Sequence, residues 1–293
     1  MNTITDSMAH AAPATGAARS IGDILVGSGR LSAADAERVL QRQKQDKSQF
    51  GDAALALKLL TKADIDFALS KQFDYAYLSE QDTSRSPELV AAYKPFSKVG
   101  ENLRAVRSQL MLRWFNTDPS RKVIALVSPG AGEGRSFIAA NLAVVFSQQG
   151  ERTLLIDGNL RRARQHELFM LGKSAGLSGI LADRAGLEAA IAVPGLPGLT
   201  VLPAGAVPPN PQELLGRPAF GALLRAAAEQ FDVIIIDTPA GTDFADAEII
   251  ASRAGAAAIV TRKNKSLLPD ATLLARRLQD SGVALVGSIL NDD

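Results

Sequence analysis

VIALVSPGAGEGRSFIAANLAVVFSQQG, residues 123–150, contains the strongest structural signal in this chain. A short apolar run leads into a glycine-rich turn, and a helical pattern follows the turn. Gly130, Gly132 and Gly134 let the backbone turn sharply and bring its N–H groups against an anion, and the first turn of the following helix attracts negative charge. The stretch therefore predicts a strand, a phosphate-binding loop and a helix.

The loop departs from the usual phosphate-binding pattern at two positions. Arg135 stands where such loops carry lysine, and Pro129 stands where they carry their first glycine. Because guanidinium keeps the charge but is longer and planar, we expect phosphate binding to persist and the geometry of phosphoryl transfer to change. The hydroxyl of Ser136 is placed to bind Mg²⁺. The predicted nucleotide-binding residues of the loop are Gly130, Ala131, Gly132, Glu133, Gly134, Arg135, Ser136 and Phe137.

From about Lys122 onward, apolar runs alternate with helical stretches. The runs are VIALVS, RTLLIDG, LTVLPA, DVIIIDTP, AAAIVTR and VALVGSILN. Nearly continuous apolar strands are typical of a parallel sheet that is covered on both faces, and their alternation with helices indicates a doubly wound α/β fold. We therefore predict a P-loop α/β domain with a mostly parallel sheet over residues 97–293.

Two carboxylates follow apolar runs of this predicted sheet. Asp157 ends RTLLID and Asp237 ends FDVIIID. In open α/β sheets the ligand lies at the carboxyl edge of the strands, where an aspartate can hold Mg²⁺ or orient a nucleophile. A lone aspartate here would more often cap the next turn, but two of them downstream of a phosphate-binding loop favour a metal site made of Ser136, Asp157 and Asp237.

The N-terminal part contains an internal repeat. Residues 20–43 align with residues 49–72, and each copy predicts a short helix, a turn and a longer helix, with capping boxes at Ser32 and Thr61. We expect a helical two-repeat domain at 20–78, a disordered tail at 1–19 and a linker with one short helical segment at 79–96. The repeat resembles the N-terminal domain of type II secretion ATPases. One branch of that family binds cyclic dinucleotides through an arginine at the positions of Ser20 and Gln49, so a helical docking module is the simpler prediction here.

Composition places few further limits on the chain. Its 293 residues are 46% hydrophobic and 22% charged, with a net charge of +1 and no cysteine, which excludes disulfides and thiolate metal sites. The charge gives no reason to expect nucleic acid or an anionic membrane as a partner. No apolar run reaches the roughly 18 residues of a membrane span, and the N-terminus lacks the pattern of a secretory signal. We expect a cytoplasmic protein without direct membrane insertion.

Four motifs together resemble the bacterial tyrosine kinases of polysaccharide export, in the branch called chain-length-determinant protein tyrosine kinase. They are SPGAGEGRSF, LLIDGNLRR, FDVIIIDTPAG and LPAGAVPPNPQELLGRP. The resemblance implies ATP and Mg²⁺ as cofactors, Arg135 and Ser136 in Walker A, Asp157 in Walker A′ and Asp237 in Walker B. Arg135 and Asp157 would then be catalytic. The second aspartate of Walker A′ is Asn159 here, and an asparagine can neither act as a base nor add a full negative charge.

The resemblance also implies how subunits assemble. Glu101, Arg104 and Arg107 follow the E-x-x-R-x-x-R pattern through which these kinases pack into rings, although the same spacing also fits an intrahelical ladder. Asn291, after the last apolar run, is expected to contact adenine, or else to be a strand-end turn former. The sequence ends in VGSILNDD without a tyrosine-rich tail, and its tyrosines are Tyr75, Tyr77 and Tyr93, which puts autophosphorylation in doubt.

Three function classes remain open. The first is a protein tyrosine kinase of exopolysaccharide synthesis, working as a homo-oligomer with the cytoplasmic part of a membrane chain-length determinant and therefore peripheral to the inner membrane. The second is a nucleotide-gated adaptor of the same system. The third is a positioning ATPase, which Gly130 disfavours because those ATPases carry a lysine at that position. We expect the first.

Overall fold

The protein is described by a computed structural model that covers residues 20–72, 76–79, 81–242 and 244–292. The chain divides into two compact units, residues 1–75 and 76–293. The expected tail at 1–19 lies outside the described residues. No helix in the described ranges is long and apolar enough to cross a membrane.

The first unit consists of two helix–turn–helix repeats. Ser32 and Thr61 each accept a hydrogen bond from the backbone N–H three residues on, at 3.0 and 3.3 Å, as the capping boxes predict. Leu31 and Leu60 are buried in the core between the repeats, whereas Leu40 stays 46% exposed. The helices are α1 (Ile21–Gly27), α2 (Ala33–Asp46), α3 (Phe50–Ala56) and α4 (Lys62–Gln72).

The second unit contains a seven-stranded sheet in the order β3-β4-β2-β5-β1-β6-β7. All neighbouring strands are parallel except the β3–β4 pair, which confirms the predicted α/β class. Strand β1, which leads into the glycine-rich loop, lies between β5 and β6. The strands are β1 (Val123–Val127), β2 (Thr153–Asp157), β3 (Ile191–Ala192), β4 (Leu199–Leu202), β5 (Val233–Asp237), β6 (Ala256–Arg262) and β7 (Ala284–Asn291).

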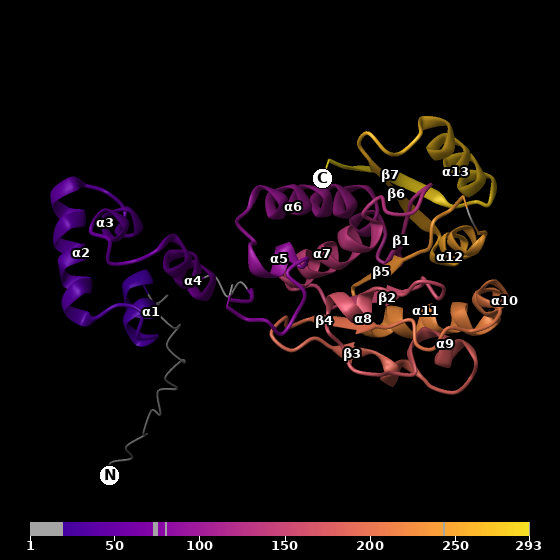
Figure 1. The fold of residues 1–293 in the computed structure, drawn as a ribbon, viewed down its shortest axis with the longest axis horizontal. Helices are drawn as coiled ribbons and strands as arrows, with labels where there is room; N and C mark the ends of the chain where they lie inside the picture. Colours follow the sequence, from indigo (N-terminus) through magenta and orange to yellow (C-terminus); the bar gives the residue numbers. More distant parts are fainter. Residues whose placement is uncertain (1–19, 73–75, 80, 243, 293) are drawn as a thin grey trace, which may run out of the picture. The chain divides into compact units, whose positions relative to one another are not determined.

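Helices cover both faces of this sheet (Figure 1). Successive residues of β1 alternate between two separate cores, Ile124 facing one and Ala125 the other, so both faces must be apolar. One face carries α5 (Val90–Tyr93), α6 (Lys98–Arg113), the 3₁₀ turn η1 (Phe115–Thr117), α7 (Arg135–Ser147) and α8 (Gln165–Leu168). The other carries α9 (Gly176–Leu181), η2 (Leu187–Ala189), α10 (Pro211–Gly216), α11 (Pro218–Gln230), α12 (Asp246–Ala254) and α13 (Leu268–Asp280).

The segment expected as a linker is instead part of this second unit. Leu89 and Tyr93 are buried in the core below α7. The Asn141 side chain accepts a hydrogen bond from Ala91 N at 2.8 Å and donates one to Glu88 O at 2.9 Å. The serines and prolines of residues 79–96 break the helical periodicity, so the sequence pattern gave no sign that this segment packs on the core. They do not prevent the short run LVAAY from doing so. The one short helix expected there is α5.

Candidate nucleotide site at the carboxyl edge of the sheet

The glycine-rich loop joins β1 to α7 and leaves the first turn of that helix uncapped. Gly134 precedes the helix with φ +88°, and no side chain caps the N-terminal N–H groups. A Cβ on Gly134 would lie 2.1 Å from Asn291 Nδ2, so only glycine fits this close approach. Free N–H groups at a helix start bind anions, and the loop therefore fits the phosphates of a nucleotide.

One carboxylate side chain and one amide side chain hold the loop in place. Glu133 is buried, and its carboxylate accepts hydrogen bonds from Gly130 N at 2.7 Å and from the hydroxyl of Ser266. The Asn291 amide donates to Glu133 O at 3.2 Å. Asn291 thus lies against the loop. If the Asn291 amide also contacted adenine, as expected from the sequence, it would have to make that contact in addition to its hydrogen bond to Glu133 O.

Arg135 is nearly buried, and it contacts interior polar groups although the residue also lines the nucleotide pocket. Its side chain is 8% exposed, and its Nε lies 3.3 Å from Asp237 Oδ1, while its Nη1 donates to the hydroxyl of Ser128. The longer guanidinium can reach the β5 carboxylate through Nε and the Ser128 hydroxyl through Nη1, two contacts that the single ammonium of a P-loop lysine would make less well. The positive charge is therefore committed to the buried aspartate.

Asp157 and Asp237 face each other as register partners on adjacent parallel strands. Both are fully buried. Burial, together with the neighbouring Asp237 carboxylate, raises the pKa of Asp157 to about 7, against hydrogen bonds from the backbone N–H groups of Gln165, Arg164 and Asn159. Asp157 can therefore hold a proton near neutral pH.

The pKa of Asp157 predicts a pH dependence of stability. An aspartate in the unfolded chain titrates near 4, whereas Asp157 in the folded protein titrates at about 7. Between these values the folded state holds a proton that the unfolded state has lost, so the free energy of unfolding falls as the pH rises from about 4 to about 7. Relative to Asp157→Asn, the wild-type slope should be steeper by up to about 1.4 kcal/mol per pH unit.

Urea unfolding at half-unit pH steps checks this expectation. The fluorescence of Trp114, the single tryptophan, reports on the sheet because its indole N–H donates to Val123 O of β1 at 3.0 Å. Parallel curves for the wild type and Asp157→Asn between pH 4 and 7 would show that Asp157 is ionised throughout.

Asn159, at the position of the second Walker A′ aspartate, acts as a turn former. Its side chain oxygen accepts a hydrogen bond from Arg162 N at 3.0 Å, and the residue is nearly buried. Within the described ranges, no group of three or more His, Cys, Asp or Glu side chains could hold a metal. A magnesium ion here would depend on Ser136 and on phosphate oxygens, which is how Mg²⁺ is usually held beside nucleotides.

Gln165 is a site residue that the sequence did not reveal. It is fully buried, and its Nε2 donates to Asp237 Oδ2 at 2.8 Å and to Ser136 O at 3.2 Å. It therefore links the β5 carboxylate to the start of α7. Its position eight residues after Asp157 carries no recognisable motif, so only the fold brings it to the site.

The open part of the site is a pocket of about 580 Å³ beside the loop. The loop residues Ala131 to Phe137 line it, together with Asn159 and Phe244. Three arginines of the turn after β2 also line it, which the sequence analysis did not single out: Arg161, Arg162 and Arg164. Arg161 pairs with the buried Asp246 at 2.8 Å and lies 3.8 Å over the Phe244 ring. Asp157 and Asp237 lie behind this pocket and do not line it.

The predicted assembly residues lie on α6, apart from this pocket. Glu101 and Arg104 form an intrahelical ion pair at 2.5 Å. Arg104 also donates to Pro95 O at 2.6 Å, and Arg107 donates to Val145 O at 3.2 Å. The ladder thus joins the first two residues, while Arg107 fastens α6 to α7.

Tyrosines of the chain lie in different environments. Tyr93 is buried, and its hydroxyl donates to Arg85 O at 3.0 Å, while burial raises its pKa. The Tyr77 ring packs edge-on against Phe96. Tyr75 lies outside the described residues. Tyr93 is therefore a structural residue in this fold.

A mostly parallel sheet with a glycine-rich loop after the inner strand β1 defines a P-loop nucleotide-binding protein. Comparison with known proteins narrows this class. The chain is 34% identical over 203 residues to tyrosine-protein kinase YwqD of Bacillus subtilis, covering 69% of this chain and 85% of that protein. The chain belongs to the bacterial tyrosine kinase family.

Other relatives and solved structures agree. A putative tyrosine-protein kinase in the cps region of Klebsiella pneumoniae is 34% identical over 73% of this chain, but the chain spans only 29% of that protein. The kinase domain of Escherichia coli tyrosine kinase ETK superposes with a TM-score of 0.67 at 30% identity, covering 74% of this chain and 89% of that domain. The septum site-determining protein MinD of Pyrococcus horikoshii, complexed with Mg-ADP, has a TM-score of 0.52 at 28% identity, covering 58% of this chain and 70% of that chain. No family model matches the chain.

Proposed function

We propose that this protein is an ATP-dependent protein tyrosine kinase of exopolysaccharide synthesis. The observation that carries the proposal is the uncapped start of α7 behind a glycine loop, with two register-paired aspartates next to it. The similarity to relatives named tyrosine-protein kinase supports the choice of reaction.

Each residue has a stated role in this proposal. The loop N–H groups from Ala131 to Phe137 hold the phosphates, whereas the Gly130 N–H is already donated to Glu133, and the Ser136 hydroxyl holds Mg²⁺. ATP supplies the transferred phosphoryl group. Asp157, which lies behind the pocket with a pKa at about 7, would act on the metal or on the tyrosine hydroxyl through a water molecule. Asp237 fixes the side chains of Arg135 and Gln165.

The decisive experiment is incubation of the purified protein with γ-labelled ATP and Mg²⁺, with a random glutamate–tyrosine copolymer as acceptor. Phosphotyrosine on the copolymer or the protein is the expected result, and Asp157→Asn should reduce it at least tenfold because it removes the titrating carboxyl. Asp232→Asn, an exposed strand-end aspartate outside the pocket, is the control. Absence of phosphotyrosine from the wild type would reject the kinase.

A second candidate, a nucleotide-gated adaptor, is favoured by one observation. Arg135 is paired with Asp237 and Asn159 forms a turn, so neither supplies the charge that phosphoryl transfer uses. ATP binding and hydrolysis without phosphotyrosine would select this reading. In either case the family resemblance supports a membrane chain-length determinant as the partner. Co-purification of this protein with the cytoplasmic part of such a determinant tests this.

Assembly gives a separate prediction. We expect Glu101, Arg104 and Arg107 to join subunits, supported by Leu112 on the same helix, which is 66% exposed. Replacement of the three charged residues by alanine should reduce the mass seen by light scattering to that of the monomer. Gln109→Ala, an exposed residue of α6, is the control. Equal masses for all variants, with and without ATP and Mg²⁺, would leave Glu101 and Arg104 as an intrahelical ladder only.

A further inference from the structure

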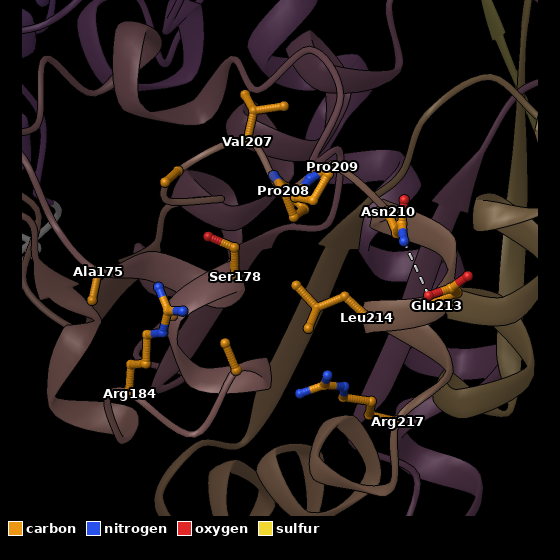
Figure 2. Close-up of a pocket in the computed structure, with 13 residues that line it drawn as sticks. Ala175, Ser178, Arg184, Val207, Pro208, Pro209, Asn210, Glu213, Leu214 and Arg217 are labelled. Carbon is orange, nitrogen blue, oxygen red and sulfur yellow. Dashed lines mark hydrogen bonds between the residues drawn. The ribbon is translucent and has the colours of Figure 1, made fainter.

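A second hollow, of about 490 Å³, lies next to the nucleotide pocket. Residues of α9, of the turn after it and of α10 line this hollow (Figure 2). It shares the segment Val207–Pro208–Pro209 with the nucleotide pocket, so this segment is a common wall. A short extended chain can therefore reach from one hollow into the other.

The hollow is held open by backbone contacts. Leu177 N and Ser178 N at the start of α9 donate to Pro203 O and Ala204 O at 2.7 and 2.8 Å. Gly205 follows with φ +81°, and a Cβ there would lie 2.1 Å from Ala175 O. Because these contacts join α9 directly to the segment before Val207, the backbone fixes this side of the hollow.

The chemistry of the hollow combines an apolar floor with cationic sides. Ala182 and Leu214 supply apolar surface, and the side chains of Arg184 and Arg217 extend into the same space (Figure 2). Glu213, the carboxylate of the lining, is held by the Asn210 amide at 3.2 Å. Within the described part of the chain, no carboxylate pairs with either guanidinium. The hollow therefore suits carboxylates on an extended chain.

We propose that this hollow binds the acidic flank of the tyrosine-bearing acceptor segment, an inference that rests on the proposed kinase function. With the tyrosine at the nucleotide pocket, an extended segment crosses Val207–Pro209 and places residues about three positions away beside Arg184 and Arg217. Arginine–carboxylate pairs add affinity and fix the direction of the chain. Arg184 can pair bidentately, whereas Arg217 already donates through Nη1 to Leu181 O at 3.3 Å. The preferred acceptor carries glutamate or aspartate three residues from its tyrosine.

Direct binding tests this without any chemistry. The probe is a fluorescein-labelled peptide with phenylalanine in place of the tyrosine and glutamate three positions to each side, measured by anisotropy on the full chain with ADP and Mg²⁺. We expect Arg184→Ala plus Arg217→Ala to weaken its binding about tenfold, with an unchanged affinity for ADP. Arg225→Ala, an exposed arginine of α11 outside the hollow, should change nothing.

Two outcomes would overturn the proposal. One is equal affinity of the wild type and the double variant for this probe. The other is equal affinity of the wild type for a peptide with glutamine in place of glutamate. Peptide phosphorylation separates the two levels of inference. If the protein phosphorylates the acidic peptide and the double variant has the wild-type KM for it, the proposed kinase function stands and this site is wrong. If the peptide binds through its charges but no phosphotyrosine forms, the site stands and the kinase function is wrong.

Discussion

Replacement of Asp237 by alanine is expected to lower the free energy of unfolding of the second unit by about 3–5 kcal/mol. The change leaves the Arg135 guanidinium, 8% exposed, without its carboxylate, and leaves the Gln165 amide without its acceptor at 2.8 Å. An unpaired charge in the interior cannot be hydrated by water. The free-energy cost of leaving it buried exceeds the free energy lost by removing the packing contacts of the Asp237 side chain. Urea unfolding followed by Trp114 fluorescence at pH 7.5 measures the change.

A matched control uses a more exposed ion pair, which lies just before β2 and β5. Arg152 and Asp232 pair at 2.6 Å, but their side chains are 58% and 34% exposed. Water can solvate both partners after either is removed, so Asp232→Ala should cost no more than about 1 kcal/mol. Equal losses for Asp237→Ala and Asp232→Ala would mean that the Arg135–Asp237 pair is not buried in solution.

The second large effect concerns nucleotide binding. A variant with Gly134→Val and Ser136→Ala should lose at least about 100-fold in affinity for ATP, or roughly 2.8 kcal/mol. Valine cannot adopt φ +88° without strain, and its Cβ would meet Asn291 Nδ2. Loss of the Ser136 hydroxyl removes the proposed protein ligand of Mg²⁺. Titration calorimetry with ATP and Mg²⁺ gives the dissociation constants.

Two further variants separate backbone strain from ligand contact. Gly150 has φ +96° at the far end of α7 with nothing near its Cβ position, so Gly150→Val carries similar strain away from the loop and should bind ATP normally. Asn291→Ala should reduce the preference for ATP over GTP if the amide reads the base. If the double variant Gly134→Val plus Ser136→Ala bound ATP as tightly as the wild type, the loop would not be part of the nucleotide site.

The agreement between sequence and structure follows the range of the interactions. The strand–loop–helix at residues 123–147 was predictable because glycine positions and apolar periodicity act within a few residues. The meeting of Asp157 and Asp237 was predictable because parallel strands end at one edge. Residues 79–96 were misjudged, because turn formers concealed the short run whose Leu89 and Tyr93 pack into a distant core.

The sequence by itself determined the α/β class, the loop and the edge at which the carboxylates lie, since each depends on local pattern and on the geometry common to all parallel sheets. Only the tertiary structure decided that Arg135 pairs with Asp237 and that Gln165 bridges this pair to α7. It also decided that Val207–Pro209 separates two hollows. These contacts join residues from different strands and turns. Buried polar groups must find a hydrogen-bond partner inside the protein, and the partner within reach depends on the tertiary fold and not on any local pattern of residues.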